Sequence, residues 1–315
     1  MHPPRFHVYL DTVARTGSIR KAAEKLHVAS TALNRKILEL EDEVGTPLFE
    51  RLPRGVRLTA AGELLVAAVR RSMADLRSTV SQIEQLRGMV RGMVRIGCAE
   101  SVASGLMPQR VAAFQALHPG VQFQLRSGVT GHILEALERD EIDLALVHDP
   151  VPSDTFKVWS AVAQPLCAML RPDHPLASRS RLRLADCEPY PVALGDHSFG
   201  SRRLIDAWAA QSRLRLQVVL EASTVQSLKE FTRHTGAISF QFQIGTQREV
   251  AHGELVALPL SDALFGRSQI TLGTRAGRSL PIAATSFLDS LMSWMAEHQH
   301  EQCTQNVCAP GERLR

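Results

Sequence analysis

The first sixty residues alternate apolar and polar positions with the period of short amphipathic helices. In the first predicted helix, apolar residues recur at i, i+3, i+4 and i+7: Phe6, Tyr9, Leu10 and Val13. Gly17 is placed to end this helix, and Ser18 can cap a second one over 19–25 (IRKAAEK). Ala22 and Ala23 are small enough to let the second helix pack closely. The pattern predicts two helices and a tight connection to a third.

Residues 27–41 (HVASTALNRKILELE) have the spacing of a helix with two unlike faces. Leu33, Ile37 and Leu40 form an apolar stripe. The other side carries four polar side chains, paired one turn apart: Ser30, Thr31, Asn34 and Arg35. Two interpretations fit this pattern. The polar face is either a solvated surface with Ser30 as the helix cap, or a surface that reads the edges of DNA bases.

A short β-hairpin is predicted at 49–59 (FERLPRGVRLT), with its turn at 53–55. Arg51, Arg54 and Arg57 crowd this hairpin, which suits a wing that holds phosphates or enters the minor groove. A helix, a tight turn and a second helix, followed by a basic hairpin, are typical of a winged helix-turn-helix. The second helix of that motif enters the major groove, so the base-reading interpretation is favoured.

A long helix is predicted from a Thr59 cap to about residue 86, because the segment has no proline and one early glycine. At about 28 residues it would reach ~42 Å, which is long for a helix in a small globular core. Apolar residues follow it at a spacing near 3.5: Leu65, Val69, Leu76, Val80 and Ile83. We expect this stripe to be a dimerisation seam. Packing of the helix on its own domain is the alternative.

After residue 93 the pattern changes to alternating strands and helices. The predicted strands of the first run are 94–99, 121–128 and 142–149, and its helices are 106–118 and 132–140. A second run covers 191–242, and a last strand and covering helix follow at 269–277 and 282–297. This alternation predicts α/β architecture with parallel sheets.

Composition divides the chain into two parts. Residues 1–96 hold 16 Lys and Arg against 10 Asp and Glu, whereas the remainder holds 20 against 22. The basic excess therefore lies in the part that carries the predicted DNA-binding motif. Five cysteines without a repeating spacing favour reduced thiols in the cytoplasm over a disulfide framework. The absence of a secretory signal pattern and of a membrane-length apolar run supports the same cytoplasmic location.

Residues 16–63 (TGSIRKAAEKLHVASTALNRKILELEDEVGTPLFERLPRGVRLTAAGE) resemble the LysR-type transcriptional regulators. The resemblance implies base-facing roles for Ser30, Thr31, Asn34 and Arg35, and backbone or minor-groove roles for Arg20, Lys36, Arg54 and Arg57. Family members commonly have Ser-Gln-Pro where this chain has Ala29, Ser30 and Thr31. The departure leaves the expected fold intact, but the DNA sequence preference cannot be borrowed from the family.

The family resemblance also implies an organisation for the whole chain. The fold is expected to be an N-terminal all-α winged helix-turn-helix with a long linker helix, and a C-terminal α/β two-lobed domain like that of periplasmic binding proteins. The expected domains are 1–58 for DNA binding, 59–88 for dimerisation and 89–297 for effector binding, with lobe I at 94–163 and 269–297 and lobe II at 168–263. Expected partners are double-stranded promoter DNA, a small-molecule effector, RNA polymerase and further copies of the chain, as a homodimer or homotetramer.

Ligands of open α/β sheets bind beyond the carboxyl ends of strands, where helix N-termini offer free N–H groups. Four stretches have that position: 99–104, 127–132, 197–203 and 223–227. A small organic anion is the expected effector, held by Ser101, Ser127, Thr130, Ser198, Phe199, Arg202 and Thr224. Phe199 would cover an apolar part of the ligand. For each hydroxyl, service as an ordinary helix cap is the alternative.

Motifs of other protein classes are missing from the sequence. There is no G-x-S-x-G elbow, phosphate-binding loop or H-E-x-x-H pair, so an enzyme is not expected and neither is a cofactor. His298, His300, Cys303 and Cys308 fit no common zinc spacing, and 298–315 is expected to be a disordered tail. The alternative hypothesis is an enzyme or solute-binding protein that carries an accessory DNA-binding domain.

Overall fold

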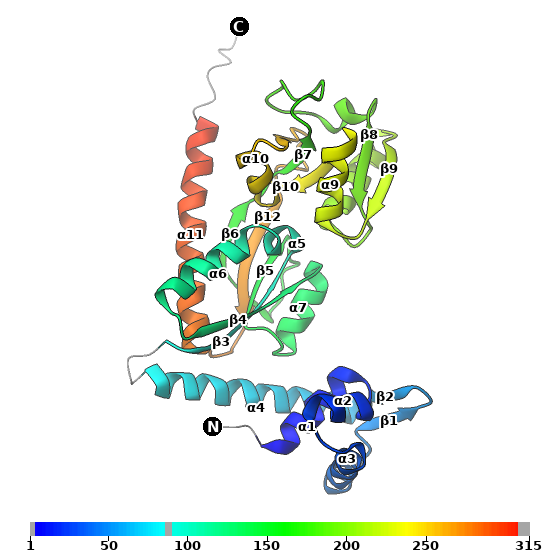
Figure 1. The fold of residues 1–315 in the computed structure, drawn as a ribbon, viewed down its shortest axis with the longest axis vertical. Helices are drawn as coiled ribbons and strands as arrows, with labels where there is room; N and C mark the ends of the chain where they lie inside the picture. Colours follow the sequence, from blue (N-terminus) through cyan, green and yellow to red (C-terminus); the bar gives the residue numbers. More distant parts are fainter. Residues whose placement is uncertain (1–3, 86–89, 308–315) are drawn as a thin grey trace. The chain divides into compact units, whose positions relative to one another are not determined.

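The computed structural model describes residues 4–85 and 90–307, and the chain divides into two compact units. The first unit contains the N-terminal elements as far as the long helix α4, and the second contains nearly all of residues 90–307. Figure 1 labels the helices and strands of both units. No helix in the described part combines the length and apolarity needed to cross a bilayer.

Three short helices, a hairpin and a long helix make up the first unit. They are α1 (Arg5–Thr16), α2 (Ile19–Leu26), α3 (Ser30–Val44), β1 (Phe49–Leu52), β2 (Gly55–Leu58) and α4 (Ala60–Gln85). Gly17 ends α1 with φ 61°, and the Ser18 side chain accepts a hydrogen bond from the Lys21 N–H, as predicted. The alternative that made Ser30 the helix cap is not what the structure shows. Ala29 is the N-cap of α3, so Ser30 begins the helix and its hydroxyl is not used as a cap.

The hairpin is fixed to the helices by backbone contacts. Strands β1 and β2 pair antiparallel, from Phe49 opposite Leu58 to Leu52 opposite Gly55. The Val56 N–H donates to the Gly17 carbonyl at 2.8 Å. Gly55 has φ 137°, and a Cβ there would lie 2.3 Å from the Gly17 oxygen. The wing therefore depends on glycine at position 55 for its close approach to the turn between α1 and α2.

The first half of α4 belongs to the core of the DNA-binding unit. The Gly62 N–H in the first turn of α4 donates to the Thr59 hydroxyl at 3.0 Å, which confirms the prediction that Thr59 caps this helix. Val69 is 4% exposed and packs with Leu10 and Val13, and Leu65 packs against the same core. At Val69 the alternative, packing of the helix on its own domain, applies, because this side chain is buried in the core of the same unit. Leu65 is half-buried against that core, and its dimerisation role stays a prediction.

The remaining part of the predicted seam is less covered. Leu76 and Val80 are half-buried and Ile83 is 51% exposed. A dimerisation role for this second half of α4 stays a prediction.

The second unit contains two five-stranded sheets. The first sheet, in lobe I, has the order β4-β3-β5-β12-β6: β3 (Gly92–Cys98), β4 (Val121–Ser127), β5 (Leu144–His148), β6 (Phe156–Ala163) and β12 (Gln269–Arg275). The second, in lobe II, has the order β11-β7-β10-β8-β9: β7 (Leu166–Leu170), β8 (Pro191–Gly195), β9 (Gln217–Ala222), β10 (Ile238–Phe242) and β11 (Val256–Pro259).

The sheets are mixed, so the prediction of purely parallel sheets is wrong. Strand β12 runs antiparallel to β5 and β6, and β7 runs antiparallel to β10 and β11. The sequence pattern also missed β6, β7 and β11. The antiparallel strands are those at which the chain enters or leaves a lobe, whereas the strand-helix units within each lobe pair in parallel.

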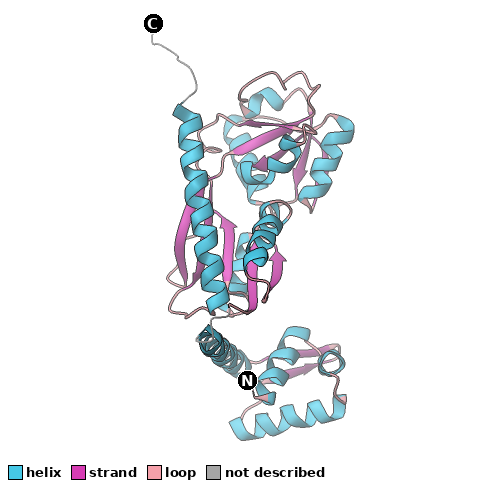
Figure 2. Cartoon of the chain, turned by 60° about the vertical axis from the view of Figure 1, so that its left-hand side comes forward, coloured by secondary structure: helices cyan, strands magenta, loops and turns pink. Residues whose placement is uncertain are grey.

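Helices cover both sheets (Figure 2). Lobe I has α5 (Glu100–Ala103), α6 (Leu106–Leu117), α7 (Thr130–Glu138) and α11 (Ile282–Val307). Lobe II has α8 (Gly200–Ser212), α9 (Val225–Thr235), α10 (Gln247–Ala251) and the 3-10 turns η1 (Leu184–Cys187) and η2 (Gln243–Gly245). In lobe I, the ring of Phe287 meets those of Phe114 and Phe123 at centroid distances of 5.1 and 4.9 Å.

Helix α11 extends beyond the expected end of the folded chain. It continues to Val307, so the prediction of a disordered tail from residue 298 is wrong for its first ten residues. His298 Nδ1 lies 3.1 Å from the Trp294 carbonyl, four residues earlier, as helical spacing requires. The side chains of His300 and Cys303, and Cys308 as a whole, lie outside the described residues.

The chain passes between the lobes twice, and the two crossings lie together. Only Gln164 and Pro165 separate β6 from β7, and the second crossing leads from β11 to β12. The Gln164 N–H donates to the Ser268 carbonyl at 2.7 Å, and the Leu166 N–H donates to the Phe265 carbonyl at 3.0 Å. Gln164 is 4% exposed, and its side-chain oxygen accepts from the Ile244 N–H at 2.8 Å. The two crossings therefore form one hydrogen-bonded hinge.

Candidate DNA-binding surface and effector cleft

Helix α3 presents the polar face that the sequence predicted. Ser30, Thr31, Arg35 and Lys36 are exposed, and Asn34 is half-buried. The Asn34 side-chain oxygen accepts two hydrogen bonds from the Arg51 guanidinium, each 3.1 Å long. Arg51 lies on β1, so this contact fixes the polar face of α3 to the wing. The sequence had placed Arg51 in a basic hairpin but gave no sign of this contact.

Most of the predicted DNA-contacting cations have acidic neighbours in the free protein. Arg35 and Lys36 both approach Glu39, at 3.6 and 2.6 Å, and Arg57 lies 2.7 Å from Glu50. Hydrogen bonding to Lys36 lowers the pKa of Glu39, and hydrogen bonding to Glu50 raises the pKa of Arg57. These exposed pairs contribute little stability, so the cations can exchange carboxylate for phosphate.

Two further predicted cations complete this surface. Arg20 lies 3.8 Å from Glu24 on α2, with a largely exposed side chain. Arg54 is exposed at the tip of the hairpin. All eight predicted DNA-binding residues are thus at least partly accessible on α2, α3 and the wing, as contact with DNA requires.

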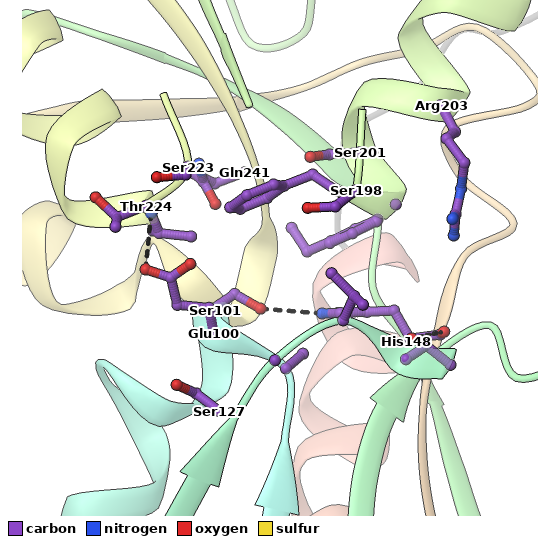
Figure 3. A pocket seen from close by; sticks show the side chains of 18 residues that line it. Glu100, Ser101, Ser127, His148, Ser198, Ser201, Arg203, Ser223, Thr224 and Gln241 are labelled. Carbon is purple, nitrogen blue, oxygen red and sulfur yellow. Dashed lines mark hydrogen bonds between the residues drawn. The ribbon is translucent and has the colours of Figure 1, made fainter. Parts of the chain in front are cut away.

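A cavity of about 350 Å³ lies between the lobes. Six of the seven predicted effector residues line it: Ser101, Ser127, Thr130, Ser198, Phe199 and Thr224. The lining also includes residues that were not among the seven: Glu100, Ser201, Arg203 and Ser223 from the predicted stretches, and His148, Gln241 and Phe242 from outside them. Figure 3 shows these side chains converging from the ends of strands and the starts of helices in both lobes.

Arg202 is the predicted residue that does not line the cavity. Its side chain is 11% exposed, and it donates to Asp206, to the Gly195 carbonyl and to Glu221. The next residue, Arg203, lines the cavity instead. Successive residues of a helix point about 100° apart, so a choice between adjacent arginines depends on how the helix is rotated about its axis. The prediction of Arg202 as an effector contact is wrong.

Helix α8 begins at the cavity without a side-chain cap. Its N-cap is Phe199, which has no oxygen to accept from the first N–H groups, and the side chain makes no capping bond. Gly195 makes room for the Phe199 ring, since a Cβ there would lie 2.8 Å from it. Arg203 stands in the first turn of the same helix. N–H groups and a guanidinium at one helix start are suited to an anion.

His148 lies at the floor of the cavity, at the end of β5. Its Nε2 is 3.1 Å from the Ser101 hydroxyl, and its ring stacks on Phe242 at a centroid distance of 4.0 Å. Burial lowers the pKa of His148 to about 3, so the imidazole is neutral at physiological pH. The Thr130 hydroxyl donates to the His148 carbonyl at 2.9 Å. Two hydroxyls predicted as ligand donors, those of Ser101 and Thr130, are therefore already engaged within lobe I.

Helix α9 begins on the opposite side of the cavity and is capped twice. The Thr224 hydroxyl accepts from the Ser227 N–H at 3.2 Å, so the alternative reading of Thr224 as a helix cap holds. The Val225 N–H donates across the cleft to the Glu100 carboxylate at 2.9 Å. Burial raises the pKa of Glu100, and the bond from Val225 opposes that rise. An acidic side chain of lobe I thus occupies the α9 N-terminus of lobe II.

Gln241 contributes an unused donor at the end of β10. The residue is 3% exposed, and its Nε2 has no hydrogen-bond partner among the described residues. Gln241 lines the cavity (Figure 3). A buried amide donor without a partner costs stability, so its position in a cavity wall suggests a ligand as the missing acceptor.

Three of the five cysteines lie among the described side chains. Cys98, Cys167 and Cys187 are buried, and burial raises the pKa of each to about 12. Within residues 4–85 and 90–307, the described side chains hold no group of three His, Cys, Asp or Glu that could bind a metal ion.

A winged helix with a polar recognition helix, followed by a two-lobed domain with a polar cleft, defines a DNA-binding regulator with an effector-binding domain. The chain belongs to the LysR family of bacterial regulators. Residues 6–63 match the family model of the bacterial regulatory helix-turn-helix protein of the lysR family, and residues 87–296 match that of the LysR substrate binding domain. The predicted family and fold class are confirmed.

Named relatives and solved structures agree with this assignment. The RuBisCO operon transcriptional regulator of Allochromatium vinosum is 28% identical over 283 residues, covering 90% of this chain and 93% of the relative. A full-length OxyR variant from Pseudomonas aeruginosa has a TM-score of 0.67 at 19% identity, with 92% and 95% of the two chains covered. The regulatory domain of Synechocystis PCC6803 CcmR, in complex with 2-PG, has a TM-score of 0.57 at 22% identity and covers 65% of this chain and 98% of its own.

Proposed function

We propose that this LysR-family regulator binds promoter DNA through α3 and the wing, and that a small organic anion in the interlobe cleft controls its activity. The observation that carries the effector proposal is the open N-terminus of α8, with Arg203 in its first turn and Gln241 in the same cavity. A cavity of about 350 Å³ suits a metabolite-sized ligand. The 2-PG complex of the structurally similar CcmR domain supports an anion.

In the proposed DNA complex, Ser30, Thr31, Asn34 and Arg35 face base edges, while Arg20, Lys36, Arg54 and Arg57 hold the backbone or the minor groove. The bond between Arg51 and Asn34 orients the amide before DNA binds. The protein acts in the cytoplasm as a dimer or tetramer and meets RNA polymerase at the promoter. Similarity to named regulators favours this role over an enzyme with an accessory DNA-binding domain.

The DNA proposal is tested by footprinting the DNA upstream of the gene, with and without variants. Asn34→Ala should weaken binding to the footprinted site by ~1–3 kcal/mol and binding to random DNA by little, because a base contact carries the sequence information. Arg54→Ala should weaken binding to both DNAs, because phosphate contacts are not sequence-specific. Equal losses on both DNAs for Asn34→Ala would contradict base reading by α3.

The effector proposal is tested by thermal shift against a panel of carboxylates and phosphates. A ligand at about 100 times its dissociation constant should stabilise the cleft domain by ~2.7 kcal/mol. Arg203→Ala should reduce the response to any anion that binds, while Arg213→Ala, on the C-terminal end of the same helix, serves as a charge-matched control. Hits that are only cationic or apolar, or that respond equally in both variants, would contradict the anion site.

A further inference from the structure

The cleft contains a carboxylate, from Glu100, and a guanidinium, from Arg203, and the two groups lie on different sides of it. Arg203 lies in the first turn of α8, while Glu100 lies at the start of α5 and reaches toward α9. Figure 3 shows them well apart, with Ser198 between them. Among the described residues, neither the Glu100 nor the Arg203 side chain has an ion-pair partner. Both charges are therefore available to a ligand.

Only one of the two helix starts in lobe II needs a ligand anion. At α9, Thr224 accepts from the Ser227 N–H and Glu100 accepts from the Val225 N–H. At α8, Phe199 supplies no cap. An anionic group that enters the cleft meets a carboxylate at α9, and meets open N–H groups and a guanidinium at α8. Because the carboxylate at α9 repels an anion and the N–H groups and guanidinium at α8 attract one, the anionic end of a ligand should bind at α8.

Glu100 leaves one oxygen for the ligand. Its Oε1 accepts the Val225 N–H at 2.9 Å, and the second oxygen faces the cavity (Figure 3). A half-buried carboxylate oxygen is best satisfied by a hydroxyl or ammonium donor. Gln241 adds an unpartnered buried amide donor to the same cavity, which calls for an acceptor on the ligand.

We propose that Glu100 makes the cleft selective for acids that also carry a hydroxyl or ammonium group, held with the acidic group at Arg203 and α8, an oxygen at Gln241 and the donor at Glu100. This inference rests on the proposed anion-binding function and narrows it to hydroxy acids and amino acids. A donor-free acid of the same size leaves the second Glu100 oxygen without a partner, and it lacks the positive charge with which an amino acid offsets the Glu100 carboxylate. Glu100 is a specificity-determining residue in this scheme.

The test uses two matched series on the full-length protein, measured by isothermal titration. The first series is succinate, malate and aspartate, and the second is 3-hydroxypropionate phosphate, 3-phosphoglycerate and phosphoserine. In at least one series the hydroxyl or ammonium member should bind about tenfold or more tightly than the member without a donor. Glu100→Gln should reduce that ratio to about threefold or less, because a neutral amide oxygen is a weaker acceptor for the ligand's hydroxyl or ammonium group than a carboxylate. Glu297→Gln, an exposed acid on α11, should leave the ratio unchanged.

The outcomes separate this inference from the proposed function. If the donor-free acids bind the wild-type protein as tightly as their partners, or if Glu100→Gln leaves the ratio unchanged, the anion site stands and the role of Glu100 is overturned. If no acid of either series binds the wild-type protein or the variant, the anion site itself fails, and the inference fails with it.

Should Glu100→Gln not fold, as judged by circular dichroism, a crystal structure of the wild-type protein with malate or aspartate decides the point. The donor must then lie within hydrogen-bond distance of the Glu100 carboxylate, and its placement elsewhere overturns the proposal.

Discussion

The buried histidine of the cleft predicts that acid weakens the second unit through one identifiable group. His148 is 8% exposed, its ring contacts Ser101 and Phe242, and burial lowers its pKa from 6.5 to about 3. Between these two values the unfolded chain binds a proton that the folded chain does not. Folding is therefore opposed increasingly as the pH falls through this window, and the full stability is present only above pH 6.5.

The size of the effect follows from the width of the window. Each unit of pKa difference corresponds to about 1.4 kcal/mol, so lowering the pH from 7.5 to 5.0 should cost the folded state roughly 2 kcal/mol through His148 alone. His148→Phe removes the titration and keeps an aromatic ring against Phe242. It also removes the bond to the Ser101 hydroxyl, at a cost of about 1 kcal/mol that does not depend on pH.

The assay is urea unfolding at both pH values, followed by tryptophan fluorescence. All three tryptophans, Trp159, Trp208 and Trp294, lie in the second unit, so the signal reports on the cleft domain alone. Other groups titrate in the same range and contribute equally to wild type and variant, so the difference between their pH responses isolates His148. His132→Phe, at an exposed position on α7, is the control. Equal pH responses of wild type and His148→Phe would refute the reasoning.

Three other predictions concern packing. Gly62→Ala should cost the DNA-binding unit about 1–3 kcal/mol, because the added Cβ would lie 2.0 Å from the Leu48 carbonyl oxygen; DNA affinity should fall while the tryptophan unfolding curve stays unchanged. Gln241→Met should stabilise the cleft domain by about 1 kcal/mol in urea unfolding, since it removes a buried amide that lacks a partner, and should weaken every acid that binds. Ile83→Glu should shift the mass of the protein toward the monomer in light scattering; an unchanged mass would remove the exposed end of α4 from the dimer contact.

The sequence predicted those parts of the structure that depend on local pattern. Helices α1 to α4 have apolar residues at helical spacing, and their ends coincide with residues such as Gly17 and Ser18 that act within one turn. Strand β7 was missed; β6 was missed because exposed and buried positions are mixed along it without strict alternation, and β11 because it has only four residues. The packing of α4 was misjudged at Val69 because an apolar stripe has the same spacing whether it packs on its own domain or on a second copy.

Among the residues of the cleft, too, the sequence predicted those that depend on local pattern and missed those that depend on distant contacts. Serines and threonines after strands were found, since the position of a strand end is local information. Glu100 was missed because its partner, Val225, is 125 residues away, and His148 because it ends an apolar strand like any other residue. Arg202 and Arg203 differ only in their direction around α8, which depends on the packing of the helix against its sheet.

The hinge at Gln164 constrains how the lobes can move. Because two adjacent crossings are joined by the bond from the Gln164 N–H to the Ser268 carbonyl, we expect the lobes to rotate about this line rather than to slide past each other. In a hinge rotation, the displacement of a residue grows in proportion to its distance from the hinge axis. The length of a ligand that spans the cleft would then set the opening angle between the lobes. The edges of the lobes farthest from the hinge would move by more than the parts that contact the ligand.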